Sequence, residues 1–141
     1  MTKGTFGSTL YAPSGRLLDQ YLLSPATTGV PAVGAVVTTG IGAWGGYVNI
    51  IAAAAIAVEF WVCGCYINTL GAIQIFEVQV VEATPTVLFE FRLDPTAVSA
   101  NLGFIPAGAF PIYQLANAQI QARAGGAAAK VIGVSVLYSV G

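Results

Sequence analysis

The chain has 141 residues, of which 56% are hydrophobic and only 8% are charged, with a net charge of −1 and no histidine. Ordinary domains carry about 25% charged residues, so we expect much of this surface to face other molecules. The five cations are scattered, which argues against the clustered basic face that nucleic acids require. Without histidine the common nucleophile–base pairs and many metal sites are lost, so we expect no enzyme, no cofactor and no metal.

Residues 1–30 lack sustained periodicity and are predicted to form an extended N-terminal arm. Ser14 is a suitable cap for a short helix over residues 16–23, which Pro25 would end. The alternative to an arm that reaches a partner is that the same side chains pack on their own domain. The apolar side chains expected to contact a partner are Phe6, Leu10, Tyr11, Leu17, Leu18, Tyr21 and Leu22.

Two stretches without formal charge, 20–58 and 95–122, need to be weighed as membrane spans. A spanning helix requires about 20 mostly apolar residues. Both stretches are broken at short intervals by glycine and proline, and the most helical window, 48–58, has only about eleven residues. A small membrane protein is therefore the least favoured alternative, and we expect no membrane partner.

Gly40-Ile-Gly42-Ala-Trp-Gly45 has the spacing of the dinucleotide-binding glycine motif. That motif needs a strand before it, a helix after it and an acidic residue about 20 residues further on. A strand over 34–39 fits, but the segment that follows runs into an apolar β pattern and no acidic residue is well placed. We therefore expect a flexible loop between strands. If Trp44 and Tyr47 are exposed in it, they could stack on sugars or anchor a partner.

Beyond this loop, apolar and polar residues alternate with a period of two, which predicts half-buried strands. Clusters of glycine, proline or asparagine separate the segments. Short strands at this spacing predict an all-β fold, an antiparallel β-sandwich or jelly roll, over residues 31–141. The expected strands cover residues 57–67, 73–82, 87–94, 119–124 and 131–140.

Cys63 and Cys65 cannot complete a zinc site without further cysteines or any histidine. We expect two small buried hydrophobes, and so few cysteines mildly favour an intracellular origin. The carboxylates of the central strands are expected on outward faces of the strands, or in cross-strand pairs with Arg92, rather than in a catalytic pair. These carboxylates are Glu59, Glu77, Glu82, Glu90 and Asp94.

Residues 111–124 read Pro-Ile-Tyr-Gln-Leu-Ala-Asn-Ala-Gln-Ile-Gln-Ala-Arg-Ala, and a small-residue turn leads from them to Val131-Ile-Gly-Val-Ser-Val-Leu-Tyr138. This order resembles the closing segment of small jelly-roll virion proteins of tailed bacteriophages, the capsid decoration (cement) proteins. The chain departs from that pattern at Leu115-Ala116-Asn117, where the family has Pro-Ala-Gly. Asparagine adopts positive φ more readily than other non-glycine residues, so a turn can form there.

The resemblance implies a structural virion protein on the outer capsid surface, made in the host cytoplasm. It also implies a homotrimer whose partners are its own copies and the major capsid protein of the same virion. A receptor- or glycan-binding module of a phage fibre or tail is the second hypothesis. That hypothesis predicts that Trp44 and Tyr47 are exposed beside polar side chains.

Overall fold

The computed structural model describes residues 22–23, 35–68, 74–83, 86–94 and 103–140. Within these ranges the chain forms strands and no helix, which confirms the all-β prediction. No helix in them is long and apolar enough to cross a membrane. The strands are β1 Leu22–Leu23, β2 Ala35–Ile41, β3 Val48–Ile51, β4 Phe60–Asn68, β5 Phe76–Glu82, β6 Thr86–Leu93, β7 Gly103–Pro106, β8 Ile112–Gln114, β9 Ile120–Gly126 and β10 Val131–Val140.

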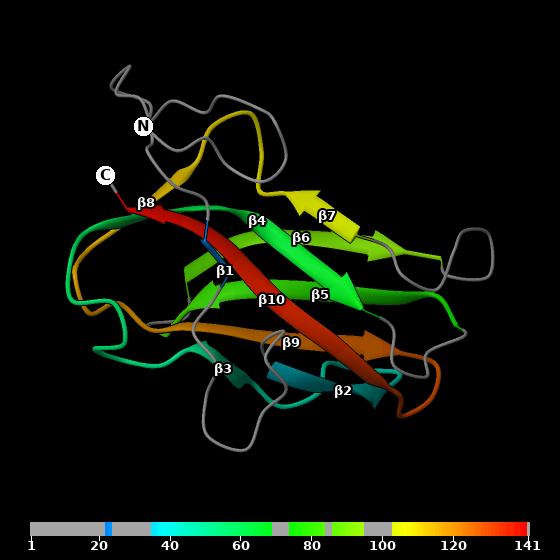
Figure 1. The fold of residues 1–141 in the computed structure, drawn as a ribbon. Coiled ribbons are helices and arrows are strands. Elements are labelled where there is room, and N and C mark those ends of the chain that lie inside the picture. The colour runs from blue at the N-terminus through cyan, green and yellow to red at the C-terminus, as the bar shows by residue number, and fades with distance from the viewer. Residues whose placement is uncertain (1–21, 24–34, 69–73, 84–85, 95–102, 141) are drawn as a thin grey trace.

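The strands form two sheets packed against each other, as predicted for a sandwich (Figure 1). In the first sheet, β10 lies between β4 on one side and β1 and β2 on the other, and β7 and β8 both pair with the far side of β4. In the second sheet, β9 pairs with β5 and β3, and β6 pairs with β5. Strand β6 therefore ends one sheet, and β7 with β8 ends the other.

Strand β2 joins the two sheets. Residues 35–38 pair antiparallel with β10, and residues 39–41 pair parallel with β9. This parallel pairing departs from the antiparallel arrangement of the other strands, because β2 passes from one sheet to the other along its length. Strand β2 thus connects the first sheet to the second along one side of the sandwich.

The core between the sheets follows the predicted alternation most closely in β9 and β10. Ile120, Ala122 and Ala124 of β9 are fully buried, while the intervening Gln121 and Arg123 are partly exposed. In β10 the inward set of Ile132, Val134, Val136 and Tyr138 belongs to the core cluster, with Val140 packed against it. The other face of β10 is buried as well, since Ser135, Leu137 and Ser139 are inaccessible to solvent.

Among the described strands, β-bulges break the alternation in β3, between Asn49 and Ile51, in β4, and in the pairing of β5 with β6. Val62 pairs with Tyr138 and Gly64 with Leu137, so Cys63 is an extra residue on β4. The alternation shifts by one residue beyond it, and Tyr66 is exposed instead of sharing the face of Val62.

The bulge between β5 and β6 has the same effect. Val80 pairs with Phe89 and Val81 with Val87, which leaves Leu88 as the extra residue. Leu88 packs against the core and Val87 is exposed, the reverse of the simple period-two prediction.

Two further segments differ from their predicted conformation. The glycine and proline cluster at 103–108 is expected to separate strands, but its first four residues form strand β7. Leu22 and Leu23 form β1, paired with Tyr138 and Leu137, so the helix over 16–23 is wrong for its last two residues. A strand of the domain therefore precedes residue 31. The remaining predicted arm contacts, Phe6, Leu10, Tyr11, Leu17, Leu18 and Tyr21, lie outside the described residues.

Candidate binding site on the outer face of the second sheet

The glycine-rich segment after β2 forms a loop that packs along β9. The amide of Gly42 donates to the carbonyl of Gly126 at 2.8 Å, and the amide of Gly45 donates to that of Ala124 at 2.7 Å. Trp44 forms a bridge with Gly125 between these two hydrogen bonds. The predicted interstrand loop is confirmed, and strand β3 follows it, so the geometry of a dinucleotide-binding motif is excluded.

Gly40, near the end of β2, is a position at which the chain needs glycine to enter this loop. A Cβ atom at Gly40 would lie 2.4 Å from the carbonyl oxygen of Ala43 and 2.7 Å from the carbonyl carbon of Trp44. Real side chains do not approach backbone atoms so closely. The glycine therefore serves a tight backbone crossing that holds Trp44 over β9.

Trp44 and Tyr47 both contact the guanidinium group of Arg123. The guanidinium carbon lies 5.0 Å from the centre of the Trp44 ring and 4.6 Å from that of Tyr47. Both distances lie within the range of cation–π attraction. Tyr47 is 40% exposed and Trp44 is partly buried, so both aromatic side chains reach the surface beside polar groups.

A row of hydrogen-bonded side chains continues from Arg123 across the sheet. Its Nε donates to Oε1 of Gln79 at 2.7 Å, and Nε2 of Gln79 donates to Oε2 of Glu90 at 2.8 Å. The three residues occupy facing positions on β9, β5 and β6. Gln79 is only 7% exposed, so its amide is held in one orientation and links the cation to the carboxylate.

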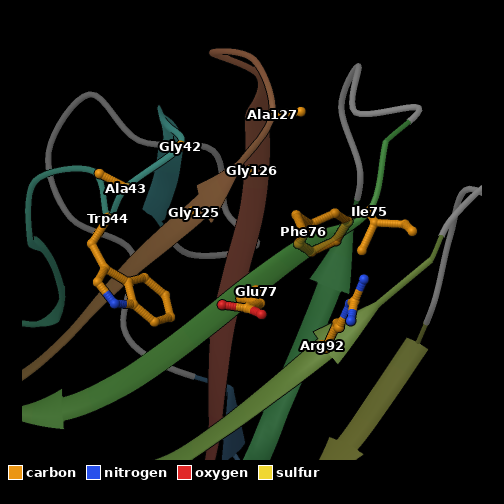
Figure 2. A pocket seen from close by; sticks show the side chains of 10 residues that line it. All are labelled: Gly42, Ala43, Trp44, Ile75, Phe76, Glu77, Arg92, Gly125, Gly126 and Ala127. Carbon is orange, nitrogen blue, oxygen red and sulfur yellow. The ribbon is translucent and has the colours of Figure 1, made fainter.

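The neighbouring row contains a gap. Trp44 pairs with Gly125, Gly125 with Glu77, and Glu77 with Arg92, so four positions line up across the sheet. Gly125 has no side chain, which lets the loop pack closely over it: a Cβ atom there would lie 3.0 Å from the carbonyl oxygen of Ala43 and 3.6 Å from Cε3 of Trp44. A hollow of about 610 Å³ opens beside this position (Figure 2). Residues of the loop, of β5 and β6 and of the end of β9 line it: Gly42, Ala43, Trp44, Ile75, Phe76, Glu77, Arg92, Gly125, Gly126 and Ala127.

The cysteines have no role in this site. Both are free and buried, as predicted, and burial raises the pKa of Cys63 to about 12 and also raises that of Cys65. Neither thiol is therefore ionised near neutral pH, as a nucleophile or metal ligand would need. Among the described residues, histidine, cysteine and carboxylate side chains form no group of three that could hold a metal ion.

The predicted cross-strand pairing of carboxylates with Arg92 is found for Glu77, which faces it in register. Glu90 instead joins the glutamine network, and Glu59 accepts a hydrogen bond from the Tyr113 hydroxyl at 2.7 Å. This hydrogen bond to Glu59 raises the pKa of Tyr113.

A second surface feature, which the sequence reasoning did not single out, is an apolar edge around β8. Leu115 is 65% exposed and Phe110 is 64% exposed, and Tyr113 of β8 is exposed between them in the chain. Val58 is also exposed and lies two residues before β4, the strand that pairs with β8. We call these four residues the β8 edge. The signal that could have found it is the run Phe110-Pro-Ile-Tyr-Gln-Leu115, which has no charge to protect a sheet edge.

The turn after the β8 edge was predicted correctly. Asn117 has a φ of 67°, its amide donates to the carbonyl of Ile56 at 2.8 Å, and its carbonyl accepts from the amide of Ala54 at 3.2 Å. Asparagine therefore occupies the positive-φ position that was inferred for Leu115-Ala116-Asn117.

A scan against protein-family models and a search of curated proteins found no match to this sequence. The function is therefore inferred from the residues and their geometry.

Proposed function

We propose that this protein is a structural virion protein of the capsid decoration type, which stabilises an assembled shell as a homotrimer and catalyses no reaction. The observation that carries the proposal is the β8 edge, four large exposed apolar side chains at the end of a sheet in a chain with very few charges. The resemblance of residues 111–124 and 131–138 to decoration proteins supports the same role.

Burial of the β8 edge against another copy supplies the driving force for association. Each large apolar side chain contributes about 1.5–3 kcal/mol when it passes from full exposure to full burial. A ring of three copies uses a heterologous interface, in which the β8 edge of one copy meets a different surface of the next. Tyr113 also brings the carboxylate of Glu59 to this edge through its hydroxyl, which gives the contact a polar rim.

Shell stabilisation then follows from mass action. A protein that binds the assembled shell but not its separated subunits shifts the equilibrium toward assembly. In this proposal the arm contacts the major capsid protein through Phe6, Leu10, Tyr11, Leu17, Leu18 and Tyr21, the residues that precede strand β1.

Co-sedimentation with assembled shells of the virus that encodes the chain tests this role. We expect the full-length protein to move with the shells, and its Leu17→Ser/Leu18→Ser variant to remain at the top of the gradient. Val131→Ser, an exposed apolar residue on β10, is the matched control and should bind as the unaltered chain does. The proposal fails if the full-length protein does not move with the shells, or if the arm variant binds as well as the control.

A second candidate is a receptor- or glycan-binding module of a phage fibre or tail. It is favoured by one observation, the placement of Tyr47 and Trp44 at the surface beside Arg123 and Gln79. Binding to host cells, with no co-sedimentation with shells, would favour this candidate over the decoration role.

A further inference from the structure

The hollow beside Trp44 has a simple geometric origin. Neighbouring strands lie about 4.8 Å apart, so Trp44 and Glu77 stand two spacings, or roughly 10 Å, apart in their row. Gly125 lies between them and contributes no side chain. The Ala43 carbonyl and the Trp44 ring pack closely over Gly125 itself. The hollow opens beside this position, where Trp44, Glu77 and Arg92 line it, and it has room for one ring-sized group.

The groups around the hollow differ in chemistry on its two sides. In Figure 2 the Trp44 ring and the Glu77 carboxylate project toward one another, and Arg92 with Ile75 closes the far side. An aromatic ring offers an apolar surface, a carboxylate accepts hydrogen bonds, and a guanidinium donates up to five. A sugar ring matches this set, because it has an apolar face of C–H groups and an edge of hydroxyls that both donate and accept.

The charges favour a neutral ligand over an anionic one. Glu77 and Arg92, which face each other in register, carry opposite charges that cancel within the hollow. Arg123, the next cation, is stacked by two rings and hydrogen-bonded to Gln79. A polyanion would need several free cations, and this surface does not supply them.

The aromatic wall is held in place before any ligand arrives. Two backbone hydrogen bonds fix the loop on β9. The guanidinium group of Arg123, two residues before Gly125 on β9, stacks on the Trp44 ring and fixes its orientation. Binding to a site of this kind costs little ordering entropy, which matters for sugars because their single contacts are weak.

We propose that the hollow between Trp44 and Arg92 binds one ring of a neutral oligosaccharide. The ring stacks on Trp44, and its hydroxyls donate to Glu77 and accept from Arg92. This binding is independent of the decoration role, and it supplies the ligand that the second candidate function requires.

The chain has two tryptophans, which give the test an internal control. The full-length protein, labelled with ¹⁵N, is titrated with cellohexaose, maltohexaose and chitohexaose, each to about 10 mM, so that dissociation constants near 1 mM are detected. We expect at least one of these sugars to shift the Trp44 indole N–H signal saturably. The indole signal of Trp61, which is buried in the first sheet, should stay in place. Absence of a saturable shift with all three sugars overturns the proposal.

Variants of the two polar groups then test the geometry. Glu77→Ala and Arg92→Ala each remove an exposed side chain, so both should fold, and each should weaken binding by about ten-fold or more. Glu82→Ala, on the same strand but away from the hollow, is the matched control and should leave the affinity unchanged. Equal affinity in all three variants overturns the proposal. A parallel titration with heparin fragments tests an anionic sugar. A Trp44 signal that shifts with heparin fragments alone would overturn the proposal that the ligand is neutral.

The sugar titration and the shell co-sedimentation test two separate proposals, so one proposal can fail while the other holds. A protein that moves with shells but binds no sugar keeps the decoration role and loses the hollow as a site. A protein that binds sugar but not shells keeps the hollow as a binding site and loses the decoration role.

Discussion

The guanidinium carbon of Arg123 lies 4.6 Å from the centre of the Tyr47 ring, although the two residues are far apart in the sequence. The same group contacts Trp44 and donates to Gln79, so one side chain ties the loop after β2 to the strand β5. Arg123 is therefore the residue that couples the aromatic surface to the sheet beneath it.

Arg123→Ala should lower the free energy of unfolding by about 2 kcal/mol, because two cation–π contacts and a charged hydrogen bond are lost and Gln79 is left with one partner fewer. Arg123→Lys should recover only part of this loss, since an ammonium cannot stack as a planar guanidinium does. Urea unfolding measures both. Arg92→Ala, an exposed cation on strand β6 of the same sheet, is the control and should change stability by no more than about 0.5 kcal/mol. Equal losses at both arginines would contradict this role.

Gly40→Ala should destabilise the protein by about 2 kcal/mol and displace Trp44, because the new Cβ would overlap the backbone of Ala43 and Trp44. Gly46→Ala is a matched control, since a Cβ there meets no atom within 4 Å. Thermal unfolding gives the stability change, and the Trp44 indole N–H signal reports the displacement. Equal stability of the two variants would show that the loop does not cross as tightly as described.

Positive φ at two non-glycine residues gives a paired prediction. Ala54 has a φ of 63° and Asn117 a φ of 67° in the facing turns that join their backbones. Ala54→Gly should raise the free energy of unfolding by about 1 kcal/mol, because glycine has no steric penalty in the left-handed region. Asn117→Val should lower it by more than about 1 kcal/mol, since a β-branched residue is disfavoured there. The same sign for both changes would contradict the assigned backbone.

The buried thiols predict a pH dependence. Burial raises the pKa of Cys63 from its ordinary value of 9.0 to about 12, so the thiol stays protonated in the folded protein while it would ionise in the unfolded chain above about 9. The stabilisation that this gives is fully present below pH 9 and is lost as the pH rises from about 9 toward 12. We expect both thiols to resist a disulfide reagent at pH 8 until denaturant is added. Rapid reaction without denaturant would contradict their burial.

Much of the fold follows from local patterns. The alternation in Ile120 to Ala124 and in Val131 to Val140 identified both strands and their inward faces, because side chains on a strand point to opposite faces in turn. Asn117 was recognised as a turn residue because asparagine tolerates positive φ.

The features of the fold that the sequence did not predict depend on contacts between distant segments. The bulges at Cys63 and Leu88 arise from the register with β10 and β5, and neither residue type signals them locally. Residues 103–108 were expected to separate strands because they contain glycine and proline, whereas β7 forms through its pairing with β4, which the local sequence does not signal.

The candidate site was only partly visible in the sequence. Trp44 and Tyr47 stood out as aromatic residues in a glycine-rich loop. The partners Gln79, Arg123 and Glu77 come from strands far along the chain, and only the registers of β5, β6 and β9 bring them together.

The most direct measurement for the proposed function is the mass of the free protein in solution by sedimentation equilibrium. The account predicts a species of about 43 kDa, three times the 14.4 kDa chain, and predicts that Phe110→Ser/Leu115→Ser on the β8 edge shifts it toward monomer while Val131→Ser does not. A 14.4 kDa monomer at every concentration, or a trimer that the edge variant leaves intact, would contradict it.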